Sequence, residues 1–131
     1  MTNTAILCVD DEVMILKSLE IELQAAFGRN YLYEVAESAE EALEIMEELN
    51  EEGLQLVIII SDWLMPGMKG DEFLIDVHKN YPNIIKIMLT GQAPEEVIER
   101  AKEYANLYCC FSKPWDRGEL IETIQSAVAQ L

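Results

Sequence analysis

Five side chains in this sequence could carry out phosphoryl chemistry, and each stands at the end of an apolar run. Asp10 and Asp11 follow "TAILCV", Asp62 follows "VIIIS", Thr90 ends "IIKIMLT" and Lys113 follows "LYCCFS". An aspartate carboxylate can accept a phosphoryl group as a nucleophile, while a lysine and a metal ion neutralise charge in the transition state. The threonine hydroxyl and the lysine ammonium both suit phosphoryl oxygens. Asp62, which a buried strand would fix in place, is the candidate nucleophile.

The aspartates also indicate a metal site. Carboxylates crowded together repel one another by about 4 kcal/mol per pair at about 4 Å and an effective dielectric of about 20, so a cation is expected among them. Oxygen ligands with no histidine or cysteine nearby favour Mg²⁺ or a similar divalent ion. Each feature alone has an ordinary explanation, because acidic pairs commonly cap helices and Pro66, Gly67 and Gly70 could be turn residues. The joint pattern is what carries the prediction.

Five apolar runs predict the strands that would position these groups, at residues 4–10, 31–37, 54–60, 84–90 and 107–112. The run "LQLVIII" is continuous, rich in β-branched residues and short, which is typical of a central strand covered on both faces. It leads directly to Asp62.

Apolar residues at helical spacing follow each run. Ser38 and Asp116, each with a glutamate three residues later, predict capping boxes for the second and last helices. A third helix is predicted over residues 71–82. Tyr81 is expected on its apolar face, and Leu131 on the apolar face of the last helix.

Strands that alternate with helices of this length predict an α/β domain over residues 1–131, a doubly wound five-stranded parallel sheet with five helices. In such sheets the binding crevice lies beyond the carboxyl ends of the strands. All five polar side chains stand at those ends, so we expect them to converge on one rim.

Composition limits the possible partners. Nine Lys and Arg against 25 Asp and Glu give a formal net charge of -16, which argues against binding to nucleic acid or to an anionic membrane surface. The N-terminus lacks the features of a signal peptide, so a cytoplasmic location is expected. Cys8, Cys109 and Cys110 lie in apolar runs, and the last two should face opposite sides of a strand, so reduced structural thiols are expected.

Four motifs in order along the chain resemble those of the receiver domain of bacterial two-component response regulators. They are "VDDE" after the first strand, "SDWLMPGMKG" after the third, "LTG" after the fourth and "SKPW" after the fifth. The resemblance covers essentially the whole chain. It implies a flavodoxin-like fold with strand order 2-1-3-4-5 and a signalling switch rather than a metabolic enzyme.

The resemblance implies that Asp62 is the phosphoacceptor, phosphorylated by a histidine kinase, a phosphotransfer protein or a small phosphodonor. Asp11 and Asp62 would ligate Mg²⁺ together with the backbone carbonyl of Leu64. Asp10 would act on the metal mainly through a bound water.

The same resemblance assigns the remaining groups. Thr90 would hydrogen-bond the phosphoryl group and move toward it on activation, while Lys113 would pair with it. The backbone N–H groups of Trp63 and Gly91 would complete the oxyanion shell. The Lys113–Pro114 bond is expected to be cis.

One departure concerns the switch. Receivers usually carry Tyr or Phe three positions before the lysine, but here that position is Cys110. Phe111 should face the opposite side of the strand. Tyr104 or Tyr108 could serve the output surface instead, with phosphorylation still moving Thr90 and the helix after it.

Other functions are less well supported by the residues. An aspartate-nucleophile phosphatase of the haloacid dehalogenase type needs a D-x-D arrangement at the first strand, which "VDDEV" does not supply. A flavodoxin needs a Ser/Thr-rich phosphate loop after the first strand, and this sequence has none at that position. A receiver that acts as a binding module without phosphorylation remains an alternative, although every phosphorylation residue is present.

The sequence does not choose the output. The chain is expected to be either a stand-alone receiver or one excised from a longer protein, with residues 94–131 as a possible homodimer face on phosphorylation. His78 is interpreted as a surface or half-buried helix residue rather than a phosphorelay histidine.

Overall fold

Strands and helices alternate along the chain as the hydrophobic pattern predicts. The computed structural model describes residues 3–131. Its elements are β1 (Thr4–Val9), α1 (Val13–Phe27), the 3₁₀ turn η1 (Gly28–Asn30), β2 (Leu32–Ala36), α2 (Ala39–Glu51), β3 (Gln55–Ser61), α3 (Gly70–Asn80), β4 (Ile85–Thr90), α4 (Glu95–Ala105), β5 (Cys109–Ser112) and α5 (Arg117–Ala129).

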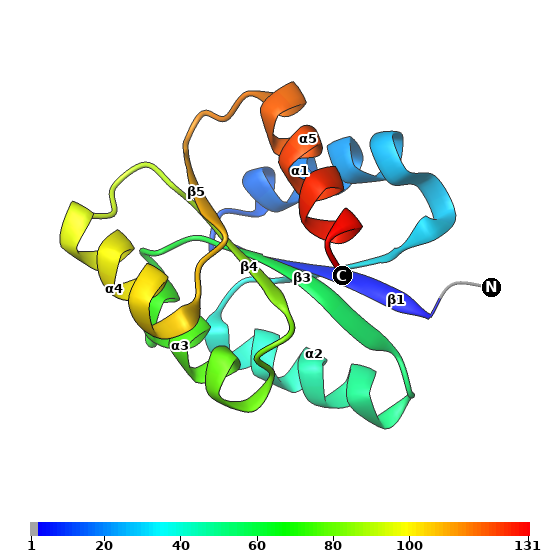
Figure 1. Ribbon diagram of the computed structural model, residues 1–131, viewed down its shortest axis with the longest axis horizontal. Coiled ribbons are helices and arrows are strands. Elements are labelled where there is room, and N and C mark those ends of the chain that lie inside the picture. Colours follow the sequence, from blue (N-terminus) through cyan, green and yellow to red (C-terminus); the bar gives the residue numbers. More distant parts are fainter. Residues whose placement is uncertain (1–2) are drawn as a thin grey trace.

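The five strands form one parallel sheet in the order β2-β1-β3-β4-β5. Helices α1 and α5 cover one face, and α2, α3 and α4 cover the other (Figure 1). This is the doubly wound, flavodoxin-like fold that was predicted. Because the order reverses beside β1 and β3, the carboxyl ends of these two strands flank the expected binding crevice.

The sheet has a hydrophobic core on each face, and β3 contributes to both. Ile58 and Ile60 pack with α1 and α5, whereas Ile59 packs with α2, α3 and α4. A strand covered on both sides needs apolar residues at every position, which explains the uninterrupted run before Asp62.

Side chains cap two helices as the sequence predicts. Ser38 Oγ accepts a hydrogen bond from the Glu41 backbone N–H at 3.1 Å, and Asp116 Oδ1 accepts one from the Glu119 N–H at 3.0 Å. The prediction that Tyr81 and Leu131 lie on apolar helix faces is wrong. Tyr81 is 39% exposed and Leu131 is 67% exposed. Helix α3 ends at Asn80, just before Tyr81 and Pro82, and α5 ends at Ala129, so neither side chain lies on a helical apolar face.

The three cysteines are free thiols. Cys110 packs on the α2, α3 and α4 face and Cys109 on the α1 and α5 face, as alternation along β5 predicts. Burial raises the pKa of Cys8 to about 12 and, together with the charge of Cys110, the pKa of Cys109 to about 11. These thiols are poor nucleophiles at neutral pH.

Within residues 3–131, none of the helices combines the length and apolar character needed to cross a membrane.

A buried lysine joins β4 to the end of α3. Lys86 is 1% exposed, and its Nζ lies 2.8 Å from His78 Nδ1 and donates to the Pro82 carbonyl oxygen at 3.3 Å. Burial lowers the pKa of Lys86 to about 8. Burial and the charge of Lys86 lower the pKa of half-buried His78, so a neutral imidazole accepts from the lysine ammonium. This contact fixes the turn that precedes β4.

Lys86 should make the stability of the fold depend on pH. Between about pH 8 and the ordinary lysine pKa of 10.5, the folded state binds fewer protons than the unfolded state, so stability should rise with pH. Relative to Lys86→Met, the wild type should gain on the order of 3 kcal/mol of unfolding free energy across this window. Urea denaturation at several pH values measures the difference, with Lys79→Met on the exposed side of α3 as a control that keeps the wild-type dependence. A difference that does not change with pH would show that Lys86 titrates normally.

Candidate functional site

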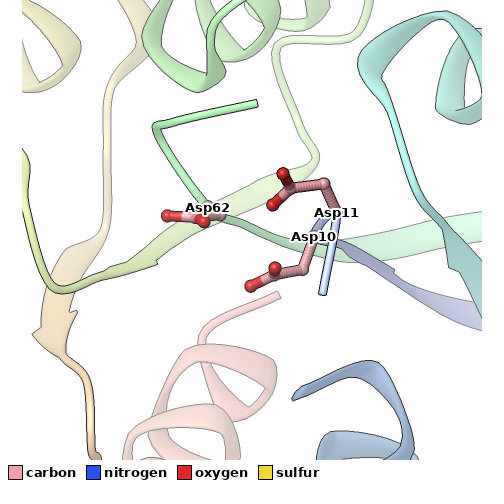
Figure 2. Close-up of side chains that lie close together, drawn as sticks. All are labelled: Asp10, Asp11 and Asp62. Carbon is pink, nitrogen blue, oxygen red and sulfur yellow. The ribbon is translucent and has the colours of Figure 1, made fainter. Parts of the chain in front are cut away.

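Three aspartates meet at the carboxyl ends of β1 and β3. Asp10 and Asp62 are buried and Asp11 is exposed, and one carboxylate oxygen from each lies within 4.8 Å of the other two. Figure 2 shows the three side chains gathered at the strand ends. The predicted convergence is therefore present in the fold.

Lys113, at the end of β5, lies among these carboxylates. Its Nζ donates to Asp10 Oδ2 at 2.7 Å and to Asp62 Oδ2 at 3.1 Å, and it lies 3.9 Å from Glu12 Oε1. The Asp10 contact spans 103 residues of sequence. One ammonium thus joins the ends of β1, β3 and β5.

The ionisation of the site reflects both burial and charge. Burial raises the pKa of Asp10, although the hydrogen bond from Lys113 and the Glu12 backbone N–H oppose the shift. Burial alone would lower the pKa of Lys113, but its hydrogen bonds to Asp10 and Asp62 outweigh that effect and raise it. Lys113 is therefore held as a cation, which a transfer site for phosphoryl oxygens needs.

Backbone contacts fix the position of Asp62. The Asp62 N–H donates to the Val9 carbonyl at 2.9 Å, which continues the pairing of β3 with β1. Asp62 Oδ1 accepts from the Trp63 backbone N–H at 2.7 Å, while Oδ2 faces Lys113. The Trp63 N–H thus lies beside the Asp62 carboxylate, and its role toward phosphoryl oxygens stays a prediction.

The loop after Asp62 returns to the same backbone. The Gly70 N–H donates to the Trp63 carbonyl at 2.8 Å, and a Cβ on Gly70 would collide with the Asp62 carbonyl oxygen. From α2, Glu40 Oε1 accepts from the Met68 N–H at 3.3 Å. Gly70 lets α3 begin directly against the Asp62 backbone.

The other predicted groups lie around the same rim. Thr90 is buried, and its Oγ1 accepts from the Gln92 N–H at 3.3 Å within its own loop. Gly91 lies beside Lys113 and has room for a Cβ, while Leu64 is exposed in the loop after Asp62. The Lys113–Pro114 peptide bond is cis, as expected.

The donor set fits a hard divalent cation. All three candidate side chains offer carboxylate oxygens, the exposed Asp11 faces solvent, and one lysine balances only part of their charge. Oxygen ligands with access to water are what Mg²⁺ selects. Asp10, Asp11 and Asp62 could hold such an ion, and the Leu64 carbonyl stays a predicted ligand.

Two residues near the site were not singled out from the sequence. Asp71, buried in the first turn of α3, accepts from Trp63 Nε1 at 3.0 Å and from Arg100 of α4 at 3.0 Å. The sequence pattern predicts for Asp71 only a position at the start of a helix. A carboxylate there has an ordinary role at a helix N-terminus, so no local signal indicated a partner 29 residues away.

The fold and site together define a class of protein: a doubly wound α/β domain with an acidic, lysine-anchored rim at its topological switch point. A family model described as the response regulator receiver domain matches residues 6–125. The chain belongs to the response regulator receiver family.

Similar proteins carry this domain in different settings. The chain is 37% identical over 71 residues, 54% of its length, to the hydrogenase transcriptional regulatory protein HoxA of Cupriavidus necator. It is 32% identical over 94% of its length to the sensor kinase CckA of Brucella abortus. The chain spans only 15% and 12% of these two relatives. A receiver domain structure from Methanospirillum hungatei JF-1 has a TM-score of 0.84 at 29% identity, covering 99% of this chain and 96% of that one.

Removing one carboxylate should separate charge repulsion from metal binding. Asp11→Asn should stabilise the metal-free protein by about 1 kcal/mol, because it relieves repulsion at a partly solvated cluster. It should also remove most of the rise in melting temperature that Mg²⁺ gives the wild type. Thermal unfolding with and without MgCl₂ measures both effects, and Glu37→Gln serves as an exposed acidic control. An unchanged Mg²⁺ response in Asp11→Asn would exclude this residue as a ligand.

Gly70→Ala should disrupt the loop that follows Asp62. Its Cβ would overlap the Asp62 carbonyl oxygen, which is backbone and cannot move aside without shifting β3 or α3. We expect a loss of about 3 kcal/mol or more in unfolding free energy, at the upper end for overpacking. Gly91→Ala is the matched control, since its nearest contact would be 3.8 Å away at Lys113 Cβ. Equal stability of the two variants would contradict the steric role of Gly70.

Proposed function

We propose that this domain is a phosphorylation-controlled signalling switch whose phosphoacceptor is Asp62. The observation that carries the proposal is the position of Asp62, held between the Lys113 ammonium at 3.1 Å and two further aspartates. Family membership supports the same chemistry. The family members are signalling modules rather than metabolic enzymes.

In the proposed reaction an Asp62 carboxylate oxygen forms a bond to phosphorus while the bond from phosphorus to the donor's leaving group breaks. The leaving group takes that electron pair, so Asp62 becomes an acyl phosphate. Lys113 holds its proton and offsets negative charge on the phosphoryl oxygens. The Trp63 N–H, already directed at Asp62 Oδ1, keeps the carboxylate oriented. A bound Mg²⁺ would neutralise oxygen charge during transfer.

Thr90 and Gly91 would hydrogen-bond the phosphoryl group. Thr90 Oγ1 is bonded within its own loop, so its capture by a phosphoryl oxygen would draw the β4–α4 loop toward Asp62. Gly91 lies beside Lys113, and its backbone N–H would donate to the same oxygens. This movement would shift a two-state equilibrium and change the surface offered to a partner.

The partners follow from the family and remain open in detail. A histidine kinase or phosphotransfer protein is the proposed phosphodonor. One relative is named as a sensor kinase and another as a transcriptional regulator, so the output differs among similar proteins. Self-association through α4, β5 and α5 stays a hypothesis, which sedimentation with and without beryllofluoride would decide.

Phosphorylation should depend on one side chain. Incubation with acetyl phosphate and Mg²⁺ should increase the intact mass by one phosphoryl group, and Asp62→Asn should abolish the increase because an amide is not a nucleophile of this kind. Asp76→Asn, a carboxylate on α3 away from the site, should be phosphorylated like the wild type. Mass spectrometry of the intact proteins reads the result. A wild type that never gains mass with small phosphodonors or a cognate kinase would overturn the proposal.

A further inference from the structure

One buried carboxylate bonds both the loop of the nucleophile and helix α4. Asp71 Oδ1 accepts from Trp63 Nε1 at 3.0 Å, and Asp71 Oδ2 accepts from Arg100 at 3.0 Å. The Asp71 side chain is 6% exposed, whereas Arg100 is 52% exposed. A buried carboxylate is stable only when its oxygens are paired, so both contacts constrain its orientation.

Helix α4 packs closely on α3, but the side chains that it buries fully are small. Its fully buried residues are two alanines, Ala101 and Ala105, and only Val97 and Ile98 add half-buried apolar surface. The other ion pair on the helix, Lys102 with Glu99 at 3.5 Å, is exposed on both sides and stays within α4. Small side chains bury little apolar area, so a polar contact contributes a larger share of what positions this helix. Among the residues that the structure describes, the pair of Arg100 with Asp71 is the ionic contact that joins α4 to α3.

Trp63 connects this pair to the phosphoacceptor. Its backbone N–H donates to Asp62 Oδ1 at 2.7 Å, and its indole donates to Asp71. Conversion of the Asp62 carboxylate to an acyl phosphate removes negative charge from Oδ1 and places new anionic oxygens nearby. The Trp63 N–H then has a different best acceptor, so the residue and its indole shift together.

This chain lacks the aromatic switch residue that receivers usually carry three positions before the lysine, on the side of the sheet that α4 covers. Cys110 occupies the position that faces α4, and Phe111 packs on the α1 and α5 side of the sheet. A polar contact can serve where an aromatic rotamer cannot, because turning one carboxylate changes both of its hydrogen bonds at once.

We propose that Asp71 is a latch, a positioning residue that holds α4 in its unphosphorylated place through Arg100 and is released through Trp63 when Asp62 is phosphorylated. The inference rests on the proposed function, since it specifies how that site communicates with α4. By linkage, weakening the latch must favour the phosphorylated conformation and tighten the binding of a phosphoryl mimic.

Two α4 variants test the latch, each losing one positive charge. Arg100→Gln should shift the amide resonances of residues 95–105 toward their beryllofluoride-bound positions before any beryllofluoride is added. Its apparent affinity for beryllofluoride with Mg²⁺ should be tighter by about fivefold, at the low end of typical coupling. Lys102→Gln should match the wild type in both measurements. In the wild type the Trp63 indole resonance should move on beryllofluoride binding. A Trp115→Phe variant removes the resonance of the other tryptophan and so assigns the Trp63 signal.

The outcomes separate the latch from the proposed function. Wild-type protein that shows no change with beryllofluoride and Mg²⁺ counts against Asp62 as a phosphoacceptor, and the latch fails with it. If the wild type responds but Arg100→Gln keeps the wild-type resonances and affinity, the latch alone is overturned. Far-ultraviolet circular dichroism confirms folding, and Arg100→Lys, which keeps the charge, should restore much of the wild-type behaviour.

Discussion

The ion pairing of Lys113 with Asp10 and Asp62 is the interaction on which the rest of the site depends. A parallel sheet directs the carboxyl ends of its strands to one rim, and here that rim gathers three carboxylates within 4.8 Å. Without a counter-charge such a cluster would oppose folding. One lysine at 2.7 and 3.1 Å balances part of the charge and leaves a negative remainder. This remaining negative charge is what would attract a divalent cation.

Delivering these charges to fixed places requires a rigid frame, which explains the sequence around them. Strand β3 is apolar along both faces, so Asp62 is fixed by two cores rather than by its own loop. Gly70 then lets α3 start against the Asp62 backbone, where any side chain would collide. The position of Asp62 is thus fixed by the packing of β3 before it and by the close approach of the Gly70 backbone after it.

Sequence patterns predict the parts that depend on local periodicity or on strand order. The five strands, the caps at Ser38 and Asp116 and the meeting of Asp62 with Lys113 all follow from such rules. Two kinds of feature escape them. Helix ends decide the exposure of Tyr81 and Leu131, and single long-range polar contacts, such as that of Asp71 with Arg100, leave no periodic trace.

The absence of an aromatic residue at position 110 bears on how the proposed phosphorylation signal would reach α4. An aromatic switch works by moving a large apolar side chain between the interior and the surface, which requires a cavity of matching size. The Cys110 side chain is too small to fill or vacate such a cavity. Phe111 packs on the opposite face of the sheet, against α1 and α5. Helix α4 fully buries two alanines, and its Arg100 also forms an ion pair with Asp71 of α3. In the proposed switch, a change in the charge of Asp62 would act over short distances on hydrogen bonds. The phosphorylation chemistry and its effect on α4 would then both depend on electrostatic contacts.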